Sequence, residues 1–94
     1  MIKIREVFTA KPGMASKMAK LMKEMMSKMS GAQIMTDIVG DYNTVVVEYE
    51  AESLAQYEKV SAEWGKDMTE EEKKKMSGYT EMYQTGRREM YKIW

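Results

Sequence analysis

Apolar and polar side chains alternate along residues 2–10 (IKIREVFTA), where β-branched and aromatic residues are frequent. A period of two in such a composition predicts a β-strand. Pro12 and Gly13 are expected to end this strand, because proline lacks a backbone N–H for the sheet and glycine permits a turn. The first predicted element is therefore a strand followed by a tight turn.

Residues 14–30 follow a helical period instead. Their main apolar positions are separated by three or four residues and are Met14, Met18, Leu21, Met25 and Met29, with Met22 on the same stripe. Lysines fill the opposite side. This spacing predicts an amphipathic helix over residues 14–30, and Gly31 is expected to end it.

Residues 32–39 and 44–50 are two further strand-like segments, and the second of them (TVVVEYE) has the stronger strand composition. The residues between them, GDYN at 40–43, are typical of a tight turn. The two segments are therefore expected to form a β-hairpin.

The helical period returns at residues 51–64, where Glu52 or Ser53 is expected to open a helix. The apolar stripe of this helix consists of Leu54, Tyr57, Val60 or Ser61, and Trp64. Gly65 is expected to break or bend it.

A helix is expected to resume with Asp67 or Thr69 as its cap. Three glutamates at 70–72 precede three lysines at 73–75, an order that suits the helix dipole. Gly86 is expected to end the helical region, and residues 87–94 predict the last strand.

The resulting order, βαββαβ, predicts a single α+β domain over residues 1–94 with the ferredoxin-like fold. In this fold two helices cover one face of a four-stranded antiparallel sheet. Neither predicted face is cleanly polar: in the third strand, Val45, Val47 and Tyr49 oppose Val46, Glu48 and Glu50. We therefore expect a second copy of the chain to cover the other face, giving a homodimer.

Composition removes several classes of function. Fifteen basic and fifteen acidic residues give no net charge, so nucleic acid is not an expected partner. The absence of Cys and His argues against a metal site or a bound cofactor. We find no apolar run long enough for stable membrane insertion and no signal peptide, and we expect a cytoplasmic protein.

The methionine-rich stripe of residues 14–30 has three interpretations. Its helical spacing is what a core-facing stripe requires, and we favour this interpretation. A docking surface is the second. A Cu(I) site of thioether ligands is the third, and soft copper sites usually also use Cys or His. Because methionine side chains repack easily, a cavity lined by them would accept flexible apolar ligands.

Three segments together resemble the dimeric α+β barrel superfamily, and in particular its NIPSNAP-like branch: KPG at 11–13, GDYNTVVVEYEAESLAQYEKV at 40–60 and GRREMYKIW at 86–94. The resemblance covers nearly the whole chain and includes no catalytic motif. It implies a homodimer whose two sheets face each other as a barrel with the helices outside. It also implies that a ligand cavity, where one exists, lies between the helices and the sheet of one subunit.

The superfamily's cofactor-free monooxygenases place an Asn, a Trp and a Tyr or Arg around an aromatic substrate. Trp64 matches the Trp of that pattern, whereas Asn43 is the only Asn and lies in the predicted turn at 40–43. The residues expected to contact a ligand are Ile4, Phe8, Met18, Met22, Met25, Tyr57, Trp64 and Met68. The rings of Phe8, Tyr57, Trp64, Tyr79 and Tyr83 are equally consistent with core packing.

Charged residues on the predicted strands add two hypotheses. Arg5 is expected to pair with Glu48 or Glu50, because a charge on a covered face needs a partner. Glu6 shares its face with Ile2, Ile4 and Phe8, so it would be a carboxylate near the cavity. Glu6 and Trp64 are therefore the candidate catalytic residues.

Two functions follow from these features. The first is a homodimeric protein that binds a small lipophilic molecule between helices and sheet. The second is a cofactor-independent monooxygenase or isomerase. A structural dimer with a filled core and no ligand is a third interpretation.

Overall fold

The computed structural model describes residues 1–29, 31–66 and 68–94. Its elements, in chain order, are β1 (Ile2–Ala10), α1 (Ala15–Met25), β2 (Gln33–Thr36), β3 (Thr44–Ala51), α2 (Leu54–Glu63), α3 (Glu70–Met76), the 3-10 helix η1 (Tyr79–Glu81) and β4 (Tyr83–Lys92). The predicted ferredoxin-like fold is confirmed, with the second helical region divided into α2 and α3.

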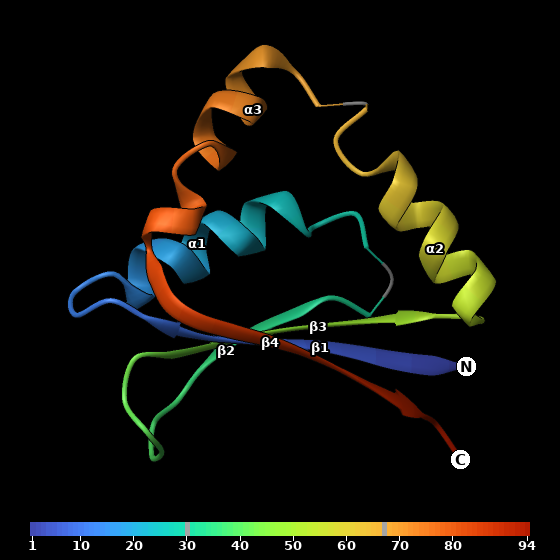
Figure 1. The fold of residues 1–94 in the computed structure, drawn as a ribbon, viewed down its shortest axis with the longest axis horizontal. Coiled ribbons are helices and arrows are strands. Elements are labelled where there is room, and N and C mark those ends of the chain that lie inside the picture. The colour runs from blue at the N-terminus through green and yellow to red at the C-terminus, as the bar shows by residue number, and fades with distance from the viewer. Residues whose placement is uncertain (30, 67) are drawn as a thin grey trace.

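The four strands form one antiparallel sheet in the order β2-β3-β1-β4. All the helices lie on one side of this sheet, and the β2–β3 connection and the C-terminus extend from the other side (Figure 1). The central strand β1 aligns Arg5 with Glu48 of β3 and with Glu89 of β4. Glu6, one position along, faces the helices and aligns with Val47 and Arg88.

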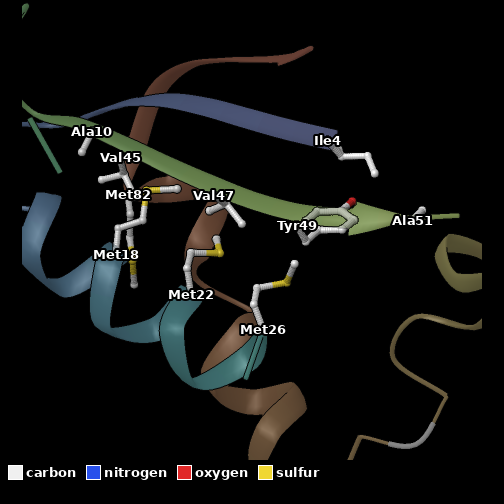
Figure 2. Packing of buried hydrophobic residues seen from close by; sticks show 10 residues of the cluster. All are labelled: Ile4, Ala10, Met18, Met22, Met26, Val45, Val47, Tyr49, Ala51 and Met82. Carbon is white, nitrogen blue, oxygen red and sulfur yellow. The ribbon is translucent and has the colours of Figure 1, made fainter. Parts of the chain in front are cut away.

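The hydrophobic core lies between α1 and β3. Met18, Met22 and Met26 point from α1 and its C-terminal cap toward the side chains of β3 (Figure 2). Met18, Val45 and Val47 are completely buried. The core interpretation of the methionine stripe is therefore confirmed for its central members.

Side-chain caps fix where α2 and α3 begin. The Ser53 hydroxyl accepts a hydrogen bond from the backbone N–H of Gln56 at 3.1 Å, as predicted. Thr69 and Glu72 form a reciprocal capping box, with two hydrogen bonds of 3.1 Å each. Asp67, the alternative predicted cap, lies outside the described residues.

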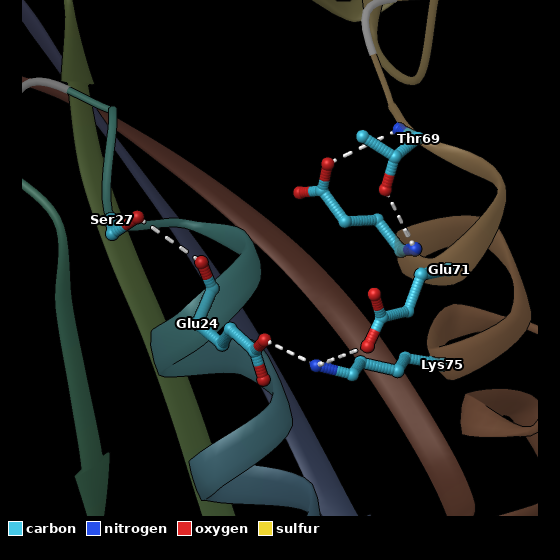
Figure 3. Close-up of polar contacts among 6 residues, drawn as sticks. Glu24, Ser27, Thr69, Glu71 and Lys75 are labelled. Carbon is cyan, nitrogen blue, oxygen red and sulfur yellow. Dashed lines mark hydrogen bonds and ion pairs between the residues drawn. The ribbon is translucent and has the colours of Figure 1, made fainter.

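Helix α1 is shorter than predicted, because it ends at Met25 instead of continuing to residue 30. The Ser27 hydroxyl donates to the backbone carbonyl of Glu24 at 3.1 Å (Figure 3). This contact satisfies a carbonyl that has no partner within the last helical turn. The chain turns there, and Gly31 then adopts a positive φ of 65°.

Strand β2 is also shorter than predicted, and β4 begins earlier. Asp37 ends β2, since its Oδ1 accepts a hydrogen bond from the backbone N–H of Thr44 at 3.0 Å. Gly86 lies inside β4 instead of before it, directly opposite Phe8. A Cβ at Gly86 would lie 3.0 Å from the Phe8 ring, so this position in the strand favours glycine.

Helix α3 is tied to α1 by an ion pair between Lys75 Nζ and Glu24 Oε1 at 2.8 Å (Figure 3). Glu71 lies 4.0 Å from the same ammonium group. The hydrogen bond to Glu24 raises the pKa of Lys75. Helix α2, in contrast, has no buried residue, and Leu54 of its predicted apolar stripe is exposed.

Among the described residues, no helix is both long and apolar enough to cross a membrane.

Candidate functional site

A cavity of about 490 Å³ lies between the three α-helices and the helix-covered face of the sheet. Two structural features account for it. Helix α2 buries none of its residues against the core, and the Lys75–Glu24 ion pair holds α3 beside α1. Trp64, which lines this space, is 42% exposed, so the cavity reaches the solvent-exposed surface at this residue.

The apolar part of the cavity consists of methionine side chains and aromatic rings. The methionines are Met22, Met26, Met29 and Met76, and the rings are Phe8, Tyr49, Trp64, Tyr79 and Tyr83. The Phe8 and Tyr83 ring centroids are 4.8 Å apart, and those of Tyr79 and Tyr83 are 6.0 Å apart. These three rings therefore form a continuous aromatic wall.

A polar cluster, made of Glu6, Arg88 and Tyr57, adjoins this wall. Arg88 Nε donates to Glu6 Oε1 at 2.9 Å, and Arg88 Nη2 donates to the same oxygen. Arg88 Nη1 donates to the Tyr57 hydroxyl at 2.6 Å. The guanidinium group also lies 5.8 Å from the centre of the Tyr57 ring, within range of a cation–π contact.

The protonation states of this cluster follow from its surroundings. Burial lowers the pKa of Arg88, but the hydrogen bond and charge of Glu6 raise it by more, so the net shift is upward. Burial, followed by the charge of Glu6, raises the pKa of Tyr49, which lies beside the cluster. Arg88 is therefore a cation and Tyr49 a neutral phenol throughout the physiological range.

The structure brings four of the nine sequence-predicted site residues to the cavity. Glu6, Phe8, Met22 and Trp64 line it. Tyr57 reaches it indirectly, through its hydrogen bond to Arg88.

Four of the predicted ligand contacts lie elsewhere. Ile4 and Met18 are completely buried in the hydrophobic core, whereas Met25 is 7% exposed and does not belong to that core cluster. Met68 does not line the cavity and lies beside Gly65. These four residues therefore do not line the cavity.

Arg88 is the polar residue of the cavity that sequence reasoning missed. A signal for it was present, since a carboxylate on an apolar face needs a cation, and Arg88 shares a face of the last strand with Met90. Finding it required the register of β1 against β4, which pairs Glu6 with Arg88 directly. This register is continuous from the Ile2–Lys92 pair to the Thr9–Thr85 pair, and the two strands are too far apart in sequence for the pattern to reveal it.

In the part of the chain that the structure describes, no group of three or more acidic residues is arranged to hold a metal ion.

The face of the sheet opposite the helices carries a second charged cluster. Arg5 Nε donates to Glu48 Oε2 at 2.8 Å, and Lys3 lies 3.4 Å from Glu50, so the predicted pairing of Arg5 is confirmed. The hydrogen bond to Glu48 raises the pKa of Arg5. Glu48 is only 6% exposed although no helix covers this face. Its charge is therefore screened within the chain.

Comparison with solved structures identifies several neighbours. A NIPSNAP family protein from Agrobacterium tumefaciens is 11% identical, with a TM-score of 0.79 over 96% of this chain and 82% of that protein. A NIPSNAP domain protein from Burkholderia xenovorans is 12% identical, with a TM-score of 0.72 over 100% and 95%. An antibiotic biosynthesis monooxygenase is 17% identical, with a TM-score of 0.70 over 100% and 99%.

The fold is that of the NIPSNAP and antibiotic-biosynthesis-monooxygenase-like proteins. At these identities the similarity establishes the fold alone. A scan against family models finds no match, and no curated protein has significant sequence similarity. The resemblance to the dimeric α+β barrel superfamily, inferred from three segments of the sequence, is thus confirmed at the level of the fold.

Proposed function

We propose that this protein binds a small, mainly apolar molecule in the cavity between its helices and its sheet. The observation that carries the proposal is the cavity itself, about 490 Å³ of space lined by methionine and aromatic side chains. Ligand sites in proteins commonly span about 300–1,000 Å³ and combine apolar walls with a few polar groups. The Glu6–Arg88 pair supplies those polar groups here.

The composition of the wall favours a ligand with some conformational freedom. Met22 and Met26 are nearly buried, whereas Met29 is half-buried, so the methionine side chains differ in their freedom to move. Unbranched thioethers adopt several rotamers at small cost and adapt to irregular apolar shapes. The rings of Phe8, Tyr79 and Tyr83 supply a more rigid surface opposite them.

The proposal includes a homodimer formed through the face of the sheet that the helices leave open. That face presents Met35, which is 37% exposed, and Tyr91, which is 52% exposed. The β2–β3 connection, with exposed Ile38 and Val39, extends from the same side (Figure 1). Exposed apolar side chains on both edge strands of this face and in the β2–β3 connection favour a surface that another protein covers.

Native mass spectrometry of the purified protein tests both parts. We expect a mass of two chains, and after incubation with an apolar molecule of about ten heavy atoms we expect one ligand per chain. Tyr91→Glu places a charge on the proposed interface and should give monomers, whereas Glu58→Gln on the exposed side of α2 should not. A monomeric wild-type protein would contradict the dimer, and an empty protein after incubation would contradict the ligand site.

An enzymatic function is the second candidate, because the Glu6 carboxylate and Trp64 both face the cavity. As an isomerase, Glu6 would accept a proton from a carbon atom of the substrate and return it to another, which requires no further reactant. A monooxygenase would require dioxygen as oxidant, with the substrate itself supplying the electrons. Loss of turnover with binding retained in Glu6→Gln would favour the enzyme, and unchanged ligand binding with no turnover in either protein would favour a carrier.

A further inference from the structure

In the polar cluster of Glu6, Arg88 and Tyr57, the cation is already paired, whereas one acceptor oxygen is left for the polar end of a ligand. Arg88 directs Nε and Nη2 to one oxygen of Glu6 and Nη1 to Tyr57, so its charge already has a partner. Both guanidinium contacts end on Glu6 Oε1. The other oxygen, Oε2, accepts no hydrogen bond from any residue that the structure describes.

Arg87 alternates with Arg88 along β4, so its side chain lies on the open face of the sheet, as does Glu89, which aligns with Arg5. Arg87 Nε donates to Glu89 at 3.0 Å, and this contact lowers the pKa of Glu89. On the helix-covered face, the charges of Glu6 and Arg88 therefore sum to zero. A ligand entering the cavity meets an apolar wall and one carboxylate oxygen to which no described residue donates.

We infer that this site selects a ligand whose polar end is an uncharged hydroxyl group, which donates to Glu6 Oε2. This inference rests on the proposed function and names the chemical class of its ligand. A carboxylate of the same length would approach Glu6 with a like charge and would find Arg88 already paired. An ether of the same shape would leave Glu6 Oε2 without a donor inside a partly buried site, where its side chain is 19% exposed.

A ligand series on the unmodified protein tests the inference without relying on any variant. Decanol, decanoate, decyl methyl ether and decylamine share one apolar chain and differ at the polar end. Each is titrated at neutral pH against Trp64 fluorescence in a Trp94→Phe background, in which Trp64 is the remaining tryptophan. We expect decanol to bind about tenfold or more tightly than decanoate and the ether, the ratio that one well-placed hydrogen bond supplies.

The Glu6→Gln variant then assigns the selectivity to this carboxylate. This change removes the negative charge and leaves Arg88 without its partner. The ratio of the decanol affinity to the decanoate affinity should therefore fall to about one or reverse. Glu58→Gln makes the same chemical change on the exposed side of α2 and should keep the wild-type ratio.

The outcomes separate the inference from the proposed function. Decanoate, the ether or decylamine binding as tightly as decanol would overturn the hydroxyl preference and leave the ligand site standing. A ratio unchanged in Glu6→Gln would overturn the role of Glu6. Failure of all four molecules to bind would overturn the proposed function and, with it, the inference.

Discussion

Arg88 of β4 donates two hydrogen bonds to a single oxygen of Glu6 on the adjacent strand β1, on the face of the sheet that the helices cover. The contact joins residues separated by 82 positions in the sequence. It places an ion pair beside an apolar cavity, where it accounts for much of the local polarity. The pair is therefore both a structural contact and the polar end of the candidate site.

The Arg88→Leu variant tests the structural part of this role. We expect it to lower the free energy of unfolding by about 1 kcal/mol, because Glu6 keeps its charge and loses its partner. The Glu6→Gln/Arg88→Leu double variant should be destabilised by less than the sum of the two single changes, because the contact can be lost only once. Urea denaturation of the four proteins measures this coupling, and strictly additive effects would contradict it.

The methionines of the first helical region should divide into two energetic classes. Met18 is completely buried in the core, so Met18→Ala leaves a void and should destabilise the protein by about 2–5 kcal/mol. Met29 is half-buried at the cavity, so Met29→Ala only enlarges an existing space and should destabilise it by about 1 kcal/mol or less. Urea denaturation curves compare them, and equal losses would show that the cavity side chains are packed like the core.

Gly86 should not tolerate a side chain. A Cβ there would lie 3.0 Å from Phe8 Cδ1, within the aromatic wall, so Gly86→Ala should destabilise the protein by about 1–3 kcal/mol. Gly78 provides the matched control, since a Cβ at that position meets nothing within 4 Å. Gly78→Ala should therefore change the free energy of unfolding by less than about 1 kcal/mol in either direction. Thermal unfolding of both variants measures these changes in stability. A Gly86→Ala variant as stable as the wild-type protein would contradict the described position of Phe8.

The capping box of α3 predicts a pH dependence. The hydrogen bonds with the backbone and side chain of Thr69 lower the pKa of Glu72 below its ordinary value of 4.5. A carboxylate with a lowered pKa contributes stability above that ordinary value, and the contribution is lost as the pH falls through the lowered one. In an NMR titration, the midpoint of Glu72 should therefore lie below 4.5 in the wild-type protein.

The Thr69→Ala variant should move that midpoint upward, because it removes one of the two hydrogen bonds. Loss of the cap should also destabilise the protein by about 1 kcal/mol. Thr80→Ala in η1 changes the same residue type outside the box and should leave the Glu72 midpoint unchanged. An unshifted Glu72 in Thr69→Ala would contradict the capping box.

The order of elements could be predicted because each has a local signal. The alternation of β1, the helical spacing of the methionines and the Ser53 and Thr69 caps all depend on residues close together in sequence. The prediction was wrong where a residue distant in the sequence determines the local structure. Glycine is typical of a helix end, but Gly86 lies within β4 opposite Phe8. The position favours glycine because Phe8 leaves little space for a side chain.

The candidate site was predictable only in part for the same reason. Periodicity places Met18, Met22 and Met25 on one stripe but does not reveal which of them the cavity exposes. The arrangement of the helices is needed for this, since the cavity is lined by Met22 of α1 together with Val60 and Ser61 of α2. Glu6 was identifiable from its apolar neighbours, whereas its partner Arg88 required the pairing of β1 with β4.

The most direct test of the ligand site uses the methionines themselves. Protein labelled with carbon-13 at its methionine methyl groups is titrated with decanol and followed by NMR, with single Met→Leu variants giving the assignments. We predict saturable shifts of the Met22, Met26, Met29 and Met76 resonances, which line the cavity, and no shift of Met35 on the open face of the sheet. Shifts confined to Met35, or no shifts at saturating decanol, would contradict a ligand site between the helices and the sheet.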